Sequence, residues 1–223
     1  MLERLIGNIR DYPLDYIGHA FILLPVTIGI YRRQYLNNQL KLVAFYFSIS
    51  FLEECIQLFY SLNKWSNIHL YNIYLIIDVL IIGLSYYEIF ENKIHKKTIA
   101  IATLISICVS IFFYSHDTFS SASNTVFRLL CVTLVLFYFN WLLTQMKIIN
   151  ILLHSMFWIS AGLLLYSLGT FFMYLFSQFT IGVHTKSNIF DLYWKVKQIL
   201  YIIFCLFSTI GFWVSKYDKE NYT

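Results

Sequence analysis

Long runs of apolar residues alternate with short polar stretches along the whole chain. A helix that crosses a bilayer needs about 20 apolar residues, because the hydrocarbon core is about 30 Å thick and each residue rises 1.5 Å. The pattern predicts seven spans, at residues 16–31, 42–62, 70–90, 98–114, 124–143, 151–179 and 192–215. Pro25 predicts a bend in the first. We therefore expect an all-α polytopic membrane helical bundle over residues 1–223, with connections too short to hold a separate domain.

The residues before the first run have a different pattern. Leu2, Leu5, Ile6 and Ile9 recur at helical spacing, with charged residues elsewhere on the turn. This spacing predicts a short interfacial helix over residues 1–11, lying along the membrane surface. A frayed terminus is the alternative. We do not expect a cleaved signal peptide, because the first apolar run contains a proline and is not followed by a small-residue cleavage site.

The composition agrees with a membrane protein and argues against other classes. Of the 223 residues, 59% are hydrophobic and 13% are charged, whereas a soluble domain carries about 25% charged residues. These figures argue against disorder and against direct nucleic-acid binding. The cysteines, which lie inside apolar runs without metal-binding spacing, are expected to be small core residues; they are Cys55, Cys108, Cys131 and Cys205. No cofactor is expected.

The basic residues predict which side of the membrane each connection faces. The odd-numbered connections and the C-terminal tail hold Arg32, Arg33, Lys41, Lys93, Lys96, Lys97, Lys147, Lys216 and Lys219. The other side has Arg4, Arg10, Lys64, Arg128, Lys186, Lys195 and Lys197, three of which lie inside predicted spans. Cytoplasmic loops are enriched in Lys and Arg, so we expect the N-terminus outside and the C-terminus in the cytoplasm. The basic inner loops are candidate contacts for a cytoplasmic protein partner, and a homo-oligomer is also open.

Ionisable residues within the spans are the first candidates for function. Such a group costs about 2.5 to 3.5 kcal/mol in hydrocarbon and is usually turned toward the bundle interior. The second span contains Glu53, Glu54 and Gln57, and the third contains Asp78. Counted from the outer ends of their spans, Glu53 and Asp78 lie at depths of about 13 and about 12 Å. A short connection makes these spans antiparallel neighbours, so we expect an acidic cluster in the outer half of the bundle.

Basic side chains enter the bundle from the same side. Arg128 lies about one turn into the fifth span, Lys195 and Lys197 lie in the first two turns of the seventh, and His19 lies near the outer face of the first. Together with the acids they predict a partly hydrated cavity that opens outward and serves as a ligand or proton site. Its predicted residues are His19, Glu53, Glu54, Gln57, Asp78, Arg128 and Lys197. The alternatives are basic side chains that extend to the headgroups and protonated acids that only bond neighbouring helices.

Several sharper functions fit the sequence less well. A retinal protein needs a lysine near the middle of the last span, and Lys195 and Lys197 lie too close to its outer end. A zinc site from His19, Glu53 or Glu54, and Asp78 can be drawn, but the chain has no HxxxH pair. We favour a non-enzymatic sensory, regulatory or accessory role. The first alternative is an ion or proton channel or transporter, and the second is a membrane-embedded lipid-active enzyme.

The sixth span contains a stripe of small residues. Ser155, Gly162 and Gly169 are spaced seven apart and therefore share one helix face. Small side chains on one face let a neighbouring helix approach closely. We expect this stripe to be a packing surface.

Several of these stretches resemble a family of bacterial seven-helix multi-pass membrane proteins. The shared features are an acid in the second span, the string at residues 67–74 with Asp78 one turn later, residues 118–121, and the string at 157–169. The chain departs from the family in having Asp78 in place of a glutamate and Met156 in place of a proline. Because the family is similar to the membrane sensing regions of signalling proteins, the resemblance implies a ligand-responsive role at the bacterial inner membrane.

A second resemblance rests on size, number of spans and a composition rich in Ile, Asn, Lys and Tyr. In these respects the chain is similar to the multi-pass membrane accessory proteins encoded beside RNA-targeting CRISPR effectors. This likeness implies modulation of a defence system from the membrane.

Overall fold

The computed structural model describes residues 7–10, 12–145, 148–177 and 187–220, and helices make up most of them. No β-strand occurs in these ranges. The α-helices are α2 (Pro13–Phe21), α3 (Leu23–Tyr31), α4 (Asn38–Leu62), α5 (Ile68–Tyr87), α6 (Lys93–Phe112), α7 (Ser121–Gln145), α8 (Ser155–Leu175) and α10 (Ser187–Val214). Short 3-10 helices follow α3, precede α8 and extend α10; they are Arg33–Tyr35, Ile151–Leu153 and Ser215–Glu220.

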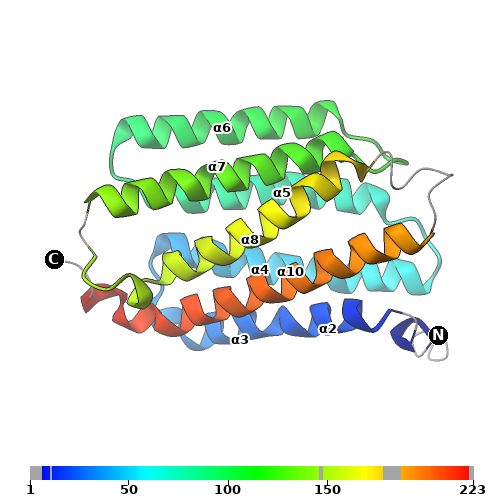
Figure 1. Ribbon diagram of the computed structural model, residues 1–223, viewed down its shortest axis with the longest axis horizontal. Helices are drawn as coiled ribbons and strands as arrows, with labels where there is room; N and C mark the ends of the chain where they lie inside the picture. Colours follow the sequence, from blue (N-terminus) through cyan, green and yellow to red (C-terminus); the bar gives the residue numbers. More distant parts are fainter. Residues whose placement is uncertain (1–6, 11, 146–147, 178–186, 221–223) are drawn as a thin grey trace.

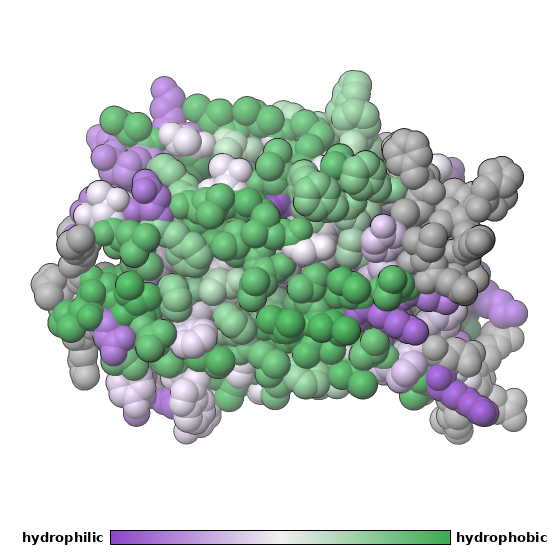
Figure 2. Space-filling view, viewed as in Figure 1, coloured by the Kyte–Doolittle hydropathy of each residue, from purple (hydrophilic) through white to green (hydrophobic). Residues whose placement is uncertain are grey.

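Seven helical segments are long and apolar enough to cross a membrane, which confirms the predicted all-α bundle of seven spans. They are Pro13–Tyr31, Asn38–Leu62, Ile68–Tyr87, Lys93–Phe112, Ser121–Gln145, Ser155–Leu175 and Asp191–Asp218. Figure 2 shows the corresponding broad hydrophobic band, with the hydrophilic residues gathered toward the two ends of the molecule. The sixth helix is shorter than predicted, because residues 151–153 form a separate 3-10 turn and α8 ends at Leu175. Residues 178–179 of the predicted span lie outside the described part.

The first span is interrupted three residues before its proline. Pro25 has no backbone N–H, so the carbonyl of Phe21 receives no helical hydrogen bond from it, and the ring crowds that carbonyl. The interruption falls at Ile22, which keeps right-handed helical angles (φ −64°, ψ −24°). The segments α2 and α3 therefore run on as one span. Before them, residues 7–10 are helical, and the remainder of the interfacial helix predicted for 1–11 falls outside the described residues.

Helix α10 is central to the packing. It lies along α8 and also contacts α2 and α3, while α8 packs on α7 and α5 packs between α4 and α6 (Figure 1). Chain ends that are far apart in sequence are thereby brought together, since α2 and α10 are neighbours. Aromatic residues fill much of the buried centre, including Phe47, Tyr86, Tyr138 and Phe204.

The small residues of α8 allow α10 to approach closely, as the sequence predicts. A Cβ atom added to Gly162 would lie 2.7 Å from the Cβ of Phe207, and one added to Gly169 would lie 2.5 Å from Cδ1 of Leu200. Both glycines thus face α10. Ser155, the third member of the stripe, is fully buried, which confirms the stripe as a packing surface.

The prediction that all four cysteines are core residues is wrong for two of them. Cys131 and Cys205 are buried, but Cys55 and Cys108 are exposed on the outside of the bundle. The physical reason is that a span is surrounded by lipid, so its outward face is as apolar as its inward face. A cysteine within an apolar run therefore carries no information about which way it points.

A buried carboxylate joins the end of the chain to the start of α8. The Oδ1 atom of Asp218, in the 3-10 helix Ser215–Glu220, accepts the backbone N–H of Ser155 at 3.0 Å and lies 2.9 Å from Nδ1 of His154. Both side chains of this pair are buried. A carboxylate is favourable at a helix N-terminus, where the backbone N–H groups and the helix dipole attract negative charge. The sequence pattern did not predict this contact.

Candidate functional site

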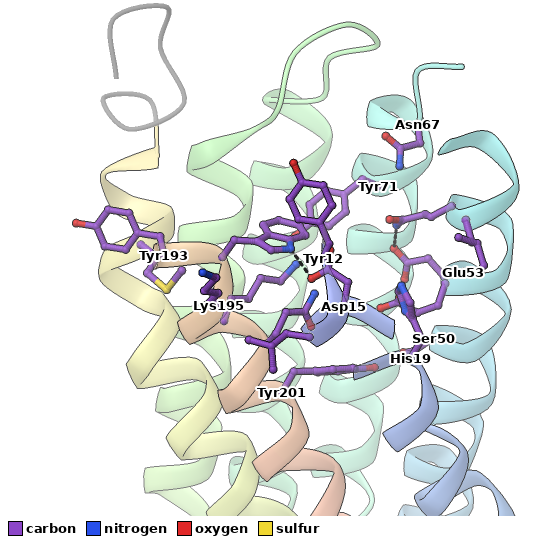
Figure 3. Close-up of a pocket in the computed structure, with 18 of the residues that line it drawn as sticks. Tyr12, Asp15, His19, Ser50, Glu53, Asn67, Tyr71, Tyr193, Lys195 and Tyr201 are labelled. Carbon is purple, nitrogen blue, oxygen red and sulfur yellow. Dashed lines mark hydrogen bonds and ion pairs between the residues drawn. The ribbon is translucent and has the colours of Figure 1, made fainter. Parts of the chain in front are cut away.

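A pocket of about 810 Å³ opens between the helices at the end of the bundle where α2 and α10 begin (Figure 3). The helices α2, α4, α5, α7, α8 and α10 all contribute to its lining. The structure brings together every residue that the sequence nominates for the site: His19, Glu53, Glu54, Gln57, Asp78, Arg128 and Lys197 all line this pocket. Depth counting along separate spans therefore locates side chains that are neighbours in space.

Helix α4 supplies two carboxylates, Glu53 and Glu54, and each has one polar side-chain contact. Gln57 lies one turn after Glu53, and its Nε2 donates to Oε1 of Glu53 at 2.7 Å, the contact expected for side chains four apart on a helix. Glu54 points toward α2, where its Oε2 lies 2.6 Å from Nδ1 of His19. Both side chains of that pair are about 30% exposed. The pair ties α2 to α4 at the pocket wall.

Asp78, on α5, is a pocket acid with a buried carboxylate oxygen, Oδ1, that is not hydrogen-bonded to a described residue. Arg128 is near enough to attract this carboxylate, and Glu53 is near enough to be repelled by it. Among the described residues every ion pair within 4.0 Å involves a histidine. Asp78 therefore faces the pocket without a direct cationic contact.

Arg128, on α7, is held by aromatic rings rather than by a carboxylate. Only 5% of the residue is exposed. The centre of its guanidinium group lies 4.5 Å from the ring centroid of Tyr166 and 5.1 Å from those of Phe127 and Tyr174. Nη2 donates to the hydroxyl of Tyr166 at 3.3 Å, and the buried Nε has no hydrogen-bond partner among the described residues. The ring faces stabilise the cation, and the Nε–H at its edge has no described partner.

Lys197, on α10, supplies a second cation inside the pocket. Its Nζ lies 4.2 Å from the ring centroid of Trp194 and 6.0 Å from that of Tyr71. The indole Nε1 of Trp194 donates in turn to Oδ1 of Asp15 on α2 at 2.7 Å. Lys195, by contrast, is exposed, although it also lines the pocket (Figure 3). The alternative in which a basic side chain extends to the lipid headgroups therefore fits Lys195 better than Lys197.

Packed aromatic side chains form the floor of the pocket. Tyr46 and Tyr166 are the lining residues there, and their rings contact Phe204 at centroid distances of 6.4 and 5.9 Å. The ring of Phe47 also packs against that of Phe204, with a centroid distance of 5.2 Å, and both phenylalanines are fully buried. Within the described residues the lining stops at this layer.

Sequence reasoning missed the tyrosines and Trp194. Tyr71 donates to Oδ1 of Asn124 at 3.1 Å, and its hydroxyl lies 3.1 Å from that of Tyr174, so a hydroxyl network runs from α5 to α8. A usable signal existed, because tyrosine normally marks the ends of a span. Tyr46 and Tyr166 lie well inside theirs, where a hydroxyl indicates a polar interior.

The lining residues do not form a metal centre. Among the described residues there is no group of three or more His, Cys, Asp or Glu side chains placed to hold a metal ion. The zinc site that can be drawn from His19, Glu53 or Glu54, and Asp78 is therefore not assembled in this geometry.

The comparisons with known proteins give no relative. No protein-family model matches the chain, and neither a curated protein nor a solved structure matches it significantly. The functional argument therefore rests on the pocket itself.

Proposed function

We propose that this chain is a non-enzymatic membrane protein with a sensory or regulatory role, and that its pocket binds a small polar ligand. One observation carries the proposal: acidic and basic side chains from five helices converge on one cavity that ends at a packed aromatic floor. Its volume of about 810 Å³ falls within the range of about 300 to 1,000 Å³ that is typical of small-molecule sites.

The aromatic floor favours a binding site over an ion path. A channel needs a route lined by polar groups or water through the full thickness of the membrane. Below the pocket the rings of Phe47, Phe204 and Phe212 pack together. Further along the bundle, the hydroxyls of Tyr86 and Ser160 bond each other at 2.8 Å. These contacts argue against the channel alternative.

One serine hydroxyl at the pocket wall is already hydrogen-bonded within its own helix. Ser50 lines the pocket, but its hydroxyl donates to the carbonyl of Tyr46 in its own helix at 3.0 Å. A catalytic serine needs instead a hydrogen bond to a general base. This arrangement favours binding over the lipid-active enzyme alternative.

The proposed orientation places the pocket on the outside of the inner membrane. The opposite end of the bundle then faces the cytoplasm and exposes basic residues for a partner protein: Arg33, Lys41, Lys93, Lys97 and Lys216 are all exposed there. Helices α8 and α10 run from the pocket to the contact between His154 and Asp218. This helix pair is the route by which occupancy of the pocket would reach the cytoplasmic side.

A flux measurement tests the proposal against its main alternative. We expect that liposomes containing the purified chain, with a pH dye inside and an imposed membrane potential, take up protons no faster than protein-free liposomes. The Glu54→Gln variant should leave this rate unchanged, and an added ionophore should collapse the gradient and show that the vesicles are sealed. A rapid proton flux that Glu54→Gln abolishes would overturn the proposal and favour a channel.

A further inference from the structure

The chemistry of the pocket walls indicates what kind of ligand fits. The basic wall comes from α7 and α10. It presents Arg128, nine-tenths buried and with an unpartnered Nε, beside Lys197, whose Nζ faces Trp194. The two cations lie near enough to repel each other. A guanidinium whose faces are covered by rings still offers N–H groups along its edge, and this fork matches a carboxylate.

The acidic wall comes from α4 and α5. Asp78 has a buried carboxylate oxygen with no described hydrogen-bond partner, and Glu53 shares only one of its oxygens, with Gln57. They lie near enough that two negative charges at these positions would repel each other. A ligand ammonium would supply the donors and the positive charge that this wall lacks, since it carries three N–H groups.

The two walls together exclude ligands of a single charge. An anion attracted by Arg128 and Lys197 would meet the carboxylates of Glu53 and Asp78 in the same pocket, and a cation would meet the two basic groups. Like-charge contacts of this kind oppose binding. A molecule with one group of each sign satisfies both walls at once. Tyrosine and tryptophan rings also line the pocket, including Tyr71, Trp194 and Tyr201, and give its carbon skeleton an apolar contact surface.

We propose that the pocket binds a zwitterion of the amino-acid or short-peptide class, with its carboxylate at Arg128 and Lys197 and its ammonium at Asp78 and Glu53. This inference rests on the function proposed above, because it names the ligand class of that same pocket. The volume of about 810 Å³ accommodates a ligand longer than a single amino acid.

Thermal unfolding with defined zwitterions tests the inference. The full chain in lipid nanodiscs is heated in the presence of each of the twenty standard amino acids and of a set of dipeptides. At least one of these compounds should raise the unfolding midpoint by about 5 °C when its concentration is about 100 times its Kd. The carboxamide and the N-acetyl derivative of the same compound should produce less than about a tenth of that shift, because each lacks one of the two charges.

Matched variants locate the binding groups. Lys197→Met and Asp78→Asn should abolish the shift, whereas Lys216→Met and Asp117→Asn should keep it, because the latter residues are exposed and outside the pocket. Lys197→Met is the more informative variant, since Lys197 is half-buried and its loss is easier to accommodate than that of Asp78. Equal shifts with the carboxamide or the N-acetyl derivative, or no shift with any compound, would overturn the zwitterion inference. Neither outcome would affect the proposed binding role of the pocket, which the flux measurement tests separately.

Discussion

Replacing Arg128 by methionine is expected to lower the free energy of unfolding by about 2 to 3 kcal/mol, because it removes a buried cation that attracts Asp78 and is stabilised by the surrounding aromatic rings. Asp78 is the acid most affected, since Arg128 is the cation that attracts it. The substitution also removes the contacts of the guanidinium with the rings of Tyr166 and Tyr174. Unfolding by SDS titration in bicelles measures the change.

Adding Asp78→Asn to Arg128→Met separates the loss of the positive charge from the loss of the packing contacts of the guanidinium. Arg128→Met combined with Asp78→Asn should be more stable than Arg128→Met alone, because the double variant no longer buries the carboxylate. Arg33→Met is the control, since Arg33 is exposed at the opposite end of the bundle, and it should change stability by less than about 0.5 kcal/mol. If Arg128→Met were no more destabilising than Arg33→Met, the pocket would not be the charge-balanced site that we describe.

Replacing Gly162 by leucine is expected to cost about 3 kcal/mol, at the upper end of the range for overpacked cores. The new side chain would begin 2.7 Å from the Cβ of Phe207 and 3.4 Å from the Cα of Phe204. Neither atom is the end of a flexible side chain, so α8 and α10 must separate. Since both helices also line the pocket, through Tyr166 and Lys197, the same change should disturb it.

Gly7→Leu is the matched control for this prediction. A Cβ atom added to Gly7 meets no atom of the described residues within 4 Å, so the same change in size should have little effect on unfolding there. Thermal midpoints of the two variants in nanodiscs give the comparison. An equally small loss of stability in both would contradict close packing of α8 on α10.

The number of spans was predictable because each is a continuous apolar run bounded by charged or polar residues. Approximate depth was also predictable, since the fixed rise of a helix converts sequence position into height. These two rules suffice to place Glu53 beside Asp78 without any knowledge of side-chain contacts. Rotation about the helix axis was harder, as Cys55 and Cys108 show, because lipid and core are equally apolar.

Contacts between distant segments were beyond sequence reasoning. The rings around Arg128 come from α7 and α8, and the bond from Trp194 to Asp15 joins the two ends of the chain. The contact of Asp218 with the start of α8 likewise joins segments that are far apart in the sequence. No local pattern fixes which helices are neighbours. It was therefore possible to nominate the charged residues of the pocket but not the aromatic residues that hold them.

The central claim is that charged residues within the spans line a pocket open to water at one end, and cysteine labelling tests it most directly. Glu53→Cys and Leu52→Cys are introduced separately after the four native cysteines are replaced by alanine. Glu53 lines the pocket, whereas the adjacent Leu52 is 57% exposed on the outside of the bundle. A membrane-impermeant thiol reagent should modify Glu53→Cys when added outside but not inside, and should leave Leu52→Cys unmodified from either side. Equal modification of the two positions, or modification of neither, would contradict the account.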